Sequence, residues 1–99
     1  ARLKLAAAGG DADIDALRAR IETDPADLDA RLQLANALAA ARDYRPALEQ
    51  LLDIVRRDRA WHDEAGRKTM LTLFTLLAGQ ARYEDLVREF RLALSRTLN

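Results

Sequence analysis

Apolar side chains recur every three or four positions along most of this chain, the spacing that places them on one side of an α-helix. The clearest stretch begins after Asp43 and has Pro46 close to its start. A proline is tolerated in the first helical turn because the backbone N–H that it lacks has no partner there. We therefore expect a helix that begins near Tyr44 and buries one face. Its apolar positions are Tyr44, Ala47, Leu48, Leu51, Leu52 and Val55.

The same stripe occurs three times. Leu48 matches Ile14 at a distance of 34 residues and Val87 at a distance of 39 residues. No alternating strand pattern competes with this periodicity, and Gly or Asp-Pro breakers separate the stripes. The pattern predicts one all-α domain over residues 1–99, built from about three helix pairs. The other apolar-rich segments are Arg2–Ala8, Leu28–Ala41 and roughly Asp63–Leu77.

A period near 34 residues with two helices per unit resembles the tetratricopeptide repeat. This resemblance implies a right-handed superhelical stack, in which each pair covers the apolar face of its neighbour. Small residues at Ala35 and Ala47 match the close-packing positions of the repeat, whereas Arg31 stands where an aromatic is usual. The residues that carry the resemblance are Leu34, Ala35, Leu38, Asp43, Tyr44, Ala47, Leu48 and Leu51.

Composition narrows the possible partners. The chain has 16 basic and 16 acidic residues, so no net field attracts nucleic acid or anionic lipid, and we predict neither as a partner. Apolar runs such as Leu71–Gly79 fall short of the roughly 20 residues that a membrane span needs. The absence of cysteine excludes disulfides and thiolate zinc sites, and it fits a reducing compartment.

Residues suited to catalysis are scarce. His62 is the only histidine and Ser95 the only serine, and neither lies in a motif that would supply a nucleophile, a base or a set of metal ligands. We therefore predict no enzyme activity, no cofactor and no metal site. For Trp61 we favour packing between helix pairs, with an exposed anchor for a partner as the alternative.

The C-terminal third resembles the closing segment of thioredoxin-fused tetratricopeptide co-chaperones of the chaperedoxin (YbbN) type. The resemblance implies a thioredoxin-like domain upstream of Ala1, a cytoplasmic location, and unfolded clients with chaperonin or Hsp70 as partners. Two alternatives stay open: a general scaffold in an envelope, secretion or regulatory complex, and an oligomerisation domain of an attached enzyme. The oligomeric state stays open too. The matching residues are Asp63, Ala65, Arg67, Lys68, Leu73, Phe74, Gly79, Leu86, Val87, Phe90, Arg91 and Leu94.

Five residues are candidates for protein binding. Asn36 matches a position that often contacts an extended peptide in tetratricopeptide grooves, although a solvated side chain is an equal alternative. Arg67 and Lys68 would add positive charge to that groove, unless they pair with nearby acids. Resemblance to the chaperedoxin type implies that Arg91 and Leu94 contact the chaperonin, although capping and burial account for the same residues.

Opposite charges also recur four residues apart, as in Asp63 with Arg67 and Glu64 with Lys68. Such pairs stabilise exposed helix faces by about 0.2 to 0.5 kcal/mol each. On the last predicted helix, Leu92 lies off the apolar stripe, so we expect some apolar surface to stay open there.

Overall fold

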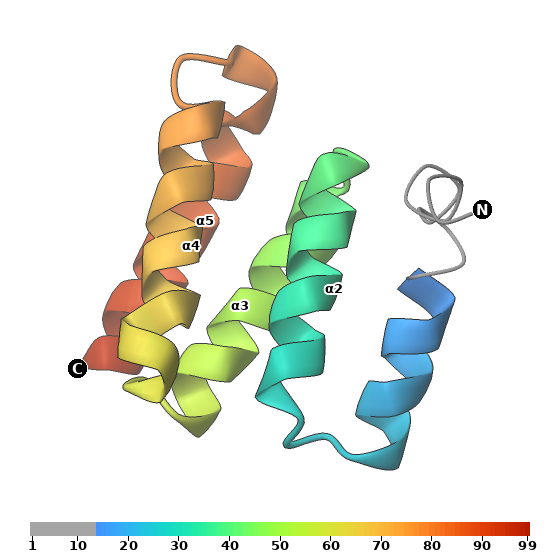
Figure 1. Cartoon of the computed structure of the whole chain (residues 1–99). Coiled ribbons are helices and arrows are strands. Elements are labelled where there is room, and N and C mark those ends of the chain that lie inside the picture. Colours follow the sequence, from blue (N-terminus) through green and yellow to red (C-terminus); the bar gives the residue numbers. More distant parts are fainter. Residues whose placement is uncertain (1–13) are drawn as a thin grey trace. The chain divides into compact units, whose positions relative to one another are not determined.

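The computed structural model describes residues 14–99, and the segment Arg2–Ala8 lies outside the described residues. Every regular element in residues 14–99 is a helix (Figure 1), which confirms the all-α prediction. The predicted start near Tyr44 is also confirmed. The elements are a helical segment at residues 14–23, α2 (Leu28–Ala40), α3 (Tyr44–Arg57), α4 (Trp61–Leu77), the 3-10 turn η1 (Ala81–Tyr83) and α5 (Glu84–Leu98).

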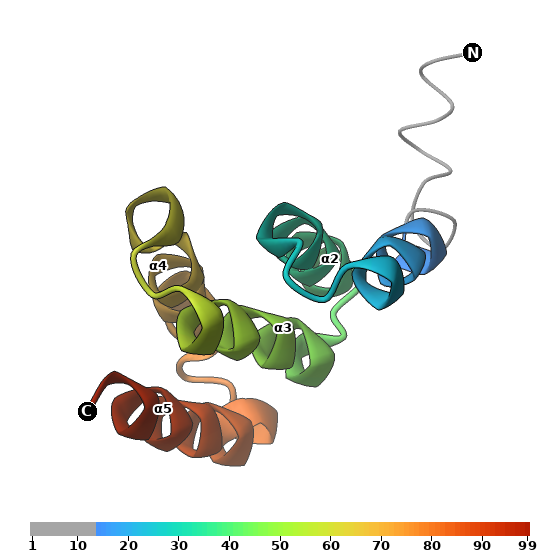
Figure 2. The same ribbon diagram turned by 90° about the horizontal axis from the view of Figure 1, so that it is seen from below.

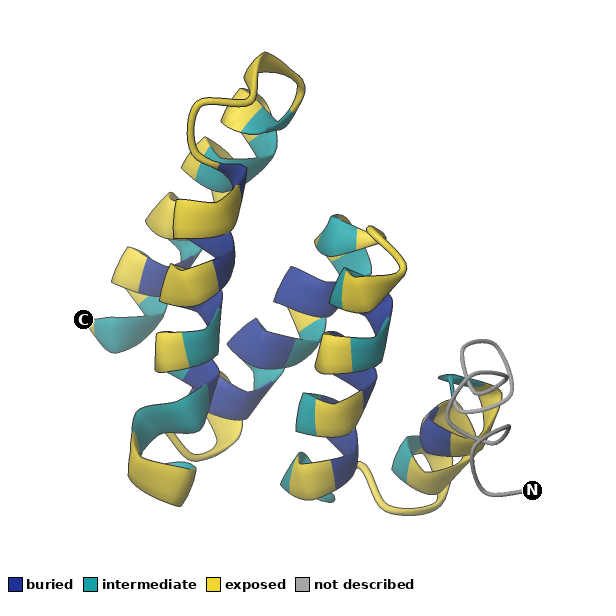
Figure 3. Ribbon diagram, turned by 45° about the horizontal axis from the view of Figure 1, so that its top comes forward, coloured by how far each residue is buried: buried dark blue, intermediate teal, exposed yellow. Residues whose placement is uncertain are grey.

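The described residues belong to two compact units, one ending at Gln50 and the other beginning at Leu51, so α3 contributes to both. In each helix the buried residues follow the predicted spacing, with exposed residues between them (Figure 3). Ala35 and Ala47, the two small residues matched to the repeat, are buried. Among residues 14–99, no helix combines the length and the apolarity needed to cross a membrane.

In the first unit, both ends of α2 are capped. An Asp27 Oδ1 atom accepts a hydrogen bond from the Ala30 N–H at 3.0 Å. At the other end, the Arg42 N–H donates to the Ala39 carbonyl at 2.9 Å and the Asp43 N–H donates to the Leu38 carbonyl at 2.8 Å. This pair of bonds is the Schellman arrangement, which puts one residue in the left-handed region. Arg42 has a φ of 64°, although glycine is the usual choice there.

The second unit contains an antiparallel pair, α4 and α5, whose helices run side by side in Figures 1 and 2. Gly79 follows α4 with a φ of 84°, a left-handed conformation that glycine adopts at no steric cost. The pair buries apolar side chains from both helices. These are Met70, Leu73, Phe74 and Leu77 of α4, with Phe90 and Leu94 of α5.

Gly66 allows α4 to approach α3 closely. A Cβ atom at this position would lie 2.9 Å from the Ile54 Cγ2 atom and 3.1 Å from the Val55 Cγ2 atom. The first of these distances is shorter than real carbon contacts allow, so no larger residue fits without movement. The repeat pattern predicts close packing at Ala35 and Ala47 but not at Gly66.

The first turn of α4 has an unusual backbone. His62, Asp63 and Glu64 all have positive φ values, between 47° and 61°. The ring of His62 stacks on the half-buried Trp61 ring, with 4.1 Å between centroids. The half-buried indole of Trp61 fits neither packing between helix pairs alone nor an exposed anchor alone.

The left-handed backbone at residues 62–64 also changes which side chains form ion pairs. The Lys68 Nζ atom lies 2.8 Å from an Asp63 oxygen, and the Arg67 Nε atom lies 2.9 Å from a Glu64 oxygen. The prediction that these four residues pair at a spacing of four was therefore wrong, since that spacing assumes regular helix over residues 62–64. The alternative role for both cations, pairing with nearby acids, is the one observed.

Candidate protein-binding surfaces

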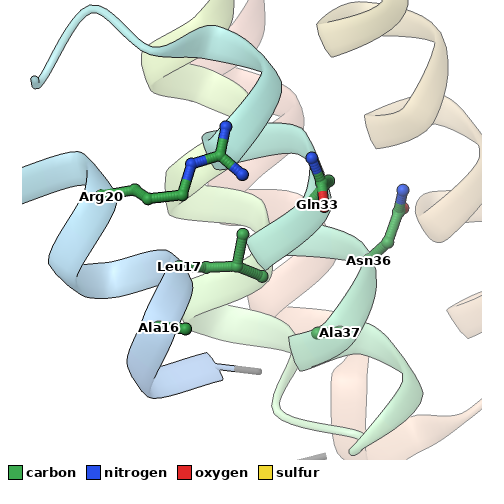
Figure 4. A pocket seen from close by; sticks show the side chains of 6 residues that line it. All are labelled: Ala16, Leu17, Arg20, Gln33, Asn36 and Ala37. Carbon is green, nitrogen blue, oxygen red and sulfur yellow. The ribbon is translucent and has the colours of Figure 1, made fainter. Parts of the chain in front are cut away.

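A groove lies between the helical segment 14–23 and α2 (Figure 4). Its volume is about 430 Å³. Leu17 points from the first segment toward α2, and Arg20 reaches in the same direction, whereas Asn36 points away from that segment. Asn36, a predicted contact residue, is exposed. The lining residues are Ala16, Leu17, Arg20, Gln33, Asn36 and Ala37.

Charges on the rim of this groove form a linked set. The Arg20 guanidinium lies 3.1 Å from an Asp27 oxygen and 3.8 Å from an Asp29 oxygen, and the Gln33 amide donates to Asp29 at 2.7 Å. The pKa of Asp27 is lowered, chiefly by the hydrogen bond from the Ala30 N–H and further by Arg20, with burial opposing. These contacts connect Arg20 of the first segment to the start of α2, and none of them involves Asn36.

Arg31 is a buried structural residue of the first unit, and its burial was not predicted from the sequence. Its side chain joins three parts of the first unit, because Nε donates to the Pro25 carbonyl and Nη1 donates to the Gln50 Oε1 atom, both at 2.9 Å. Only 6% of the residue is exposed. A charged residue is seldom buried to this extent unless its donors are satisfied. A signal existed in the repeat pattern, which places a large buried aromatic at this position.

A second surface lies on the α4–α5 pair and brings together three predicted residues. Arg67, Arg91 and Leu94 line one cavity of about 260 Å³. The Arg91 Cζ atom lies 5.0 Å from the centroid of the Phe74 ring, a cation–π distance. Arg91 also lines a neighbouring cavity of about 410 Å³ near the end of α4. The remaining residues of the smaller cavity are Leu71, Phe74, Ser95 and Leu98.

A family profile described as tetratricopeptide repeat matches residues 7–99. The chain belongs to the tetratricopeptide repeat family. Comparison with curated proteins and with solved structures gave no significant match. Tetratricopeptide domains are typically non-catalytic modules that bind proteins, so the chain is a protein-interaction module by family. In residues 14–99 no three metal-binding side chains gather, and His62 is exposed beside Trp61.

The five predicted contact residues therefore lie at two places in this tetratricopeptide domain. Asn36 belongs to the first groove, and Arg67, Arg91 and Leu94 belong to the cavity on the last helix pair. Lys68 lines neither of these and pairs with Asp63, which lowers the pKa of that carboxyl through a hydrogen bond and the lysine charge. Their role in binding stays a prediction.

The last helix pair also exposes large apolar side chains. Leu71 and Leu76 of α4 are 37% and 55% exposed, and Leu92 of α5 is 51% exposed. The exposure of Leu92 confirms the expectation that apolar surface stays open on α5. Of these three leucines, Leu71 lines the cavity that Arg67 and Arg91 share. An exposed apolar side chain next to arginines is a common feature of protein-binding surfaces.

Proposed function

We propose that this tetratricopeptide domain is the interaction module of a thioredoxin-fused, cytoplasmic co-chaperone that holds unfolded clients and contacts chaperonin or Hsp70. The observation that supports the proposal most directly is the exposure of three large apolar side chains on the α4–α5 pair, one of which, Leu71, lines a cavity. The same pair carries the residues that resemble the chaperedoxin type, among them Phe74, Arg91 and Leu94. The resemblance suggests the class of partner, and the exposed leucines are available for contact with such a partner.

The chemistry of this surface suits an unfolded client. An unfolded chain exposes apolar side chains that a folded protein hides, and it gains by covering them. Leu71, Leu76 and Leu92 offer such contact area without the need to open the core. Arginine adds contacts to carboxylates and aromatic rings that do not depend on one exact sequence. Weak contacts of this kind allow a holding chaperone to release its client.

The first experiment measures aggregation of a thermally unfolded enzyme by light scattering, with and without the full-length protein. We expect the wild type to delay aggregation, and the triple variant Leu71→Ser, Leu76→Ser and Leu92→Ser to lose most of this effect. The matched control replaces three other exposed residues of the same unit, and it should act like the wild type. These replacements are Thr72→Ser, Thr75→Ser and Ala78→Ser.

The second experiment measures direct binding of the full-length protein to purified chaperonin and to purified Hsp70 by sedimentation velocity. Arg91→Ala should weaken binding to at least one of them, whereas Arg96→Ala, an exposed change on the same helix, should not. If the full-length protein neither delays aggregation nor binds either chaperone, the co-chaperone proposal is refuted. A gene that encodes a signal peptide or another enzyme directly upstream of Ala1 would also contradict it.

A further inference from the structure

We propose that the open face of the α4–α5 pair, lined by Leu71, Phe74, Arg91, Leu94 and Leu98, docks an amphipathic α-helix of a partner protein. A carboxylate on that helix pairs with Arg91. The inference deepens the proposed function and rests on it only for the protein nature of the partner. It concerns a face of the last helix pair, separate from the Asn36 groove of the first unit.

The chain itself shows what covers an equivalent face. Residues of α3 and α5 correspond at a distance of 39, so Ile54 and Val55 match Ala93 and Leu94. Gly66 of α4 packs directly on Ile54 and Val55, and a Cβ atom there would contact both. In the earlier repeat, therefore, a helix lies on these positions. On α5 the matched residue Leu94 lines a cavity instead of a packed helix contact.

The shape of the α5 face indicates an apolar residue at the contact. The cavity of about 260 Å³ on this face has apolar atoms from Leu71, Phe74 and Leu98 around it. A leucine or phenylalanine from the incoming helix would fill this space and exclude water.

The charge of the face indicates an acidic neighbour for that residue. Arg91 stands where α3 has the buried Leu52, so an exposed cation replaces an apolar side chain at the matched position. Within residues 14–99, Arg91 makes no ion pair, and its guanidinium lies over the Phe74 ring. A guanidinium held over a ring keeps the N–H groups on its edge available to a carboxylate. Arg67 is already paired with Glu64, so Arg91 is the cation that we expect to bind the carboxylate of the incoming helix.

The test uses the 99-residue chain and a labelled synthetic peptide of about 18 residues, long enough to form a helix. The peptide carries leucines at helical spacing and one glutamate beside the leucine stripe; a matched peptide carries lysine in place of the glutamate. Binding is measured by fluorescence anisotropy, and folding of each variant by far-UV circular dichroism. The variants are Arg91→Glu, the matched charge reversal Arg96→Glu, and Ser95→Trp, which fills the cavity from an exposed position.

We expect the glutamate peptide to bind the wild type, and Arg91→Glu and Ser95→Trp each to weaken binding by about tenfold or more, as for loss of a desolvated pair. The lysine peptide should regain affinity for Arg91→Glu, and Arg96→Glu should change binding by less than about threefold because an exposed charge contributes little. If Arg91 had only a structural role, the lysine peptide would not regain affinity for Arg91→Glu.

Three outcomes would overturn the inference. The first is no binding up to the solubility limit of the peptide, and the second is an equal loss for Arg91→Glu and Arg96→Glu. The third is a concentration-dependent dimer of the wild type, abolished by Ser95→Trp in sedimentation equilibrium, which would assign the face to a second copy. If the peptide fails while the full-length protein still delays aggregation, only this inference falls and the proposed function stands.

Discussion

Replacing Gly66 by alanine should destabilise the second unit, although alanine is the better helix former. Gly66 lies inside α4, where a glycine costs about 1 kcal/mol relative to alanine in an exposed helix. On propensity alone, the substitution would therefore stabilise the protein. The structure predicts the opposite sign, because the added methyl group would lie 2.9 Å from the Ile54 Cγ2 atom, 3.2 Å from its Cβ atom and 3.1 Å from the Val55 Cγ2 atom.

The neighbours of Gly66 cannot rotate away easily. Ile54 and Val55 are β-branched residues on a helix, and such side chains keep one strongly preferred χ1 rotamer. Relief therefore requires α4 to move away from α3, and overpacking of this kind costs about 1 to 3 kcal/mol, with larger values possible. We place the cost of a shift that moves a whole helix at the upper end of this range. After the propensity gain is subtracted, the expected net loss is about 1 to 2 kcal/mol.

Urea unfolding followed by circular dichroism at 222 nm measures this loss as a lower midpoint at an unchanged slope. Thr72→Ala, at an exposed position of the same helix, is the control and should raise the midpoint slightly. In an Ile54→Ala background the cost of Gly66→Ala should shrink, since the closest atom is gone. A midpoint raised by Gly66→Ala in the wild-type background would refute the close approach of α4 and α3.

Three further predictions concern the first unit. Arg42→Gly should raise the unfolding free energy by about 0.5 to 1 kcal/mol, because glycine removes the cost of the left-handed conformation, and Arg42→Ala should not. Arg31→Ala should lower the unfolding free energy by about 2 to 4 kcal/mol, more than Gln50→Ala, since it leaves a cavity and two unpaired acceptors. Asp27→Ala should lower the melting temperature at neutral pH. Because the pKa of folded Asp27 lies below its ordinary value of 3.8, its charge-dependent contribution is complete above pH 3.8. The difference from wild type should therefore shrink as the pH falls through the folded pKa, in melts followed from pH 7 to pH 2.

Helix positions could be predicted because each depends on local periodicity and on breakers. The start at Tyr44 follows from the spacing of apolar residues and from Pro46 in the first turn. The exposure of Leu92 follows from the same geometry, since it lies off the buried stripe. These features need no knowledge of what packs against them.

The features that escaped prediction depend on partners distant in the sequence or on unusual backbone. Arg31 is buried because Pro25 and Gln50 satisfy its donors, and both partners lie outside α2. Gly66 is needed for a contact with α3 that helix propensity does not encode. At the start of α4, three positive φ values shifted the ion pairs of Arg67 and Lys68 by one residue.

At the candidate site, too, single residues could be predicted from the sequence but their contacts could not. Resemblance named Arg67, Arg91 and Leu94 separately, and only the structure places them around one cavity. The contact of Arg91 with the ring of Phe74 joins α5 to α4, and no pattern along one helix predicts it. Sequence patterns identify residues on one helix, whereas a cavity is defined by side chains from two.

Because α3 belongs to both compact units, the boundary at Gln50 and Leu51 divides a continuous helix and is a poor place to cut the chain. A shortened form that stops there would lose seven residues of α3, among them the buried Leu51, Leu52, Ile54 and Val55. Limited proteolysis should accordingly spare Tyr44–Arg57 as one piece, and any separately expressed half should retain the whole of it.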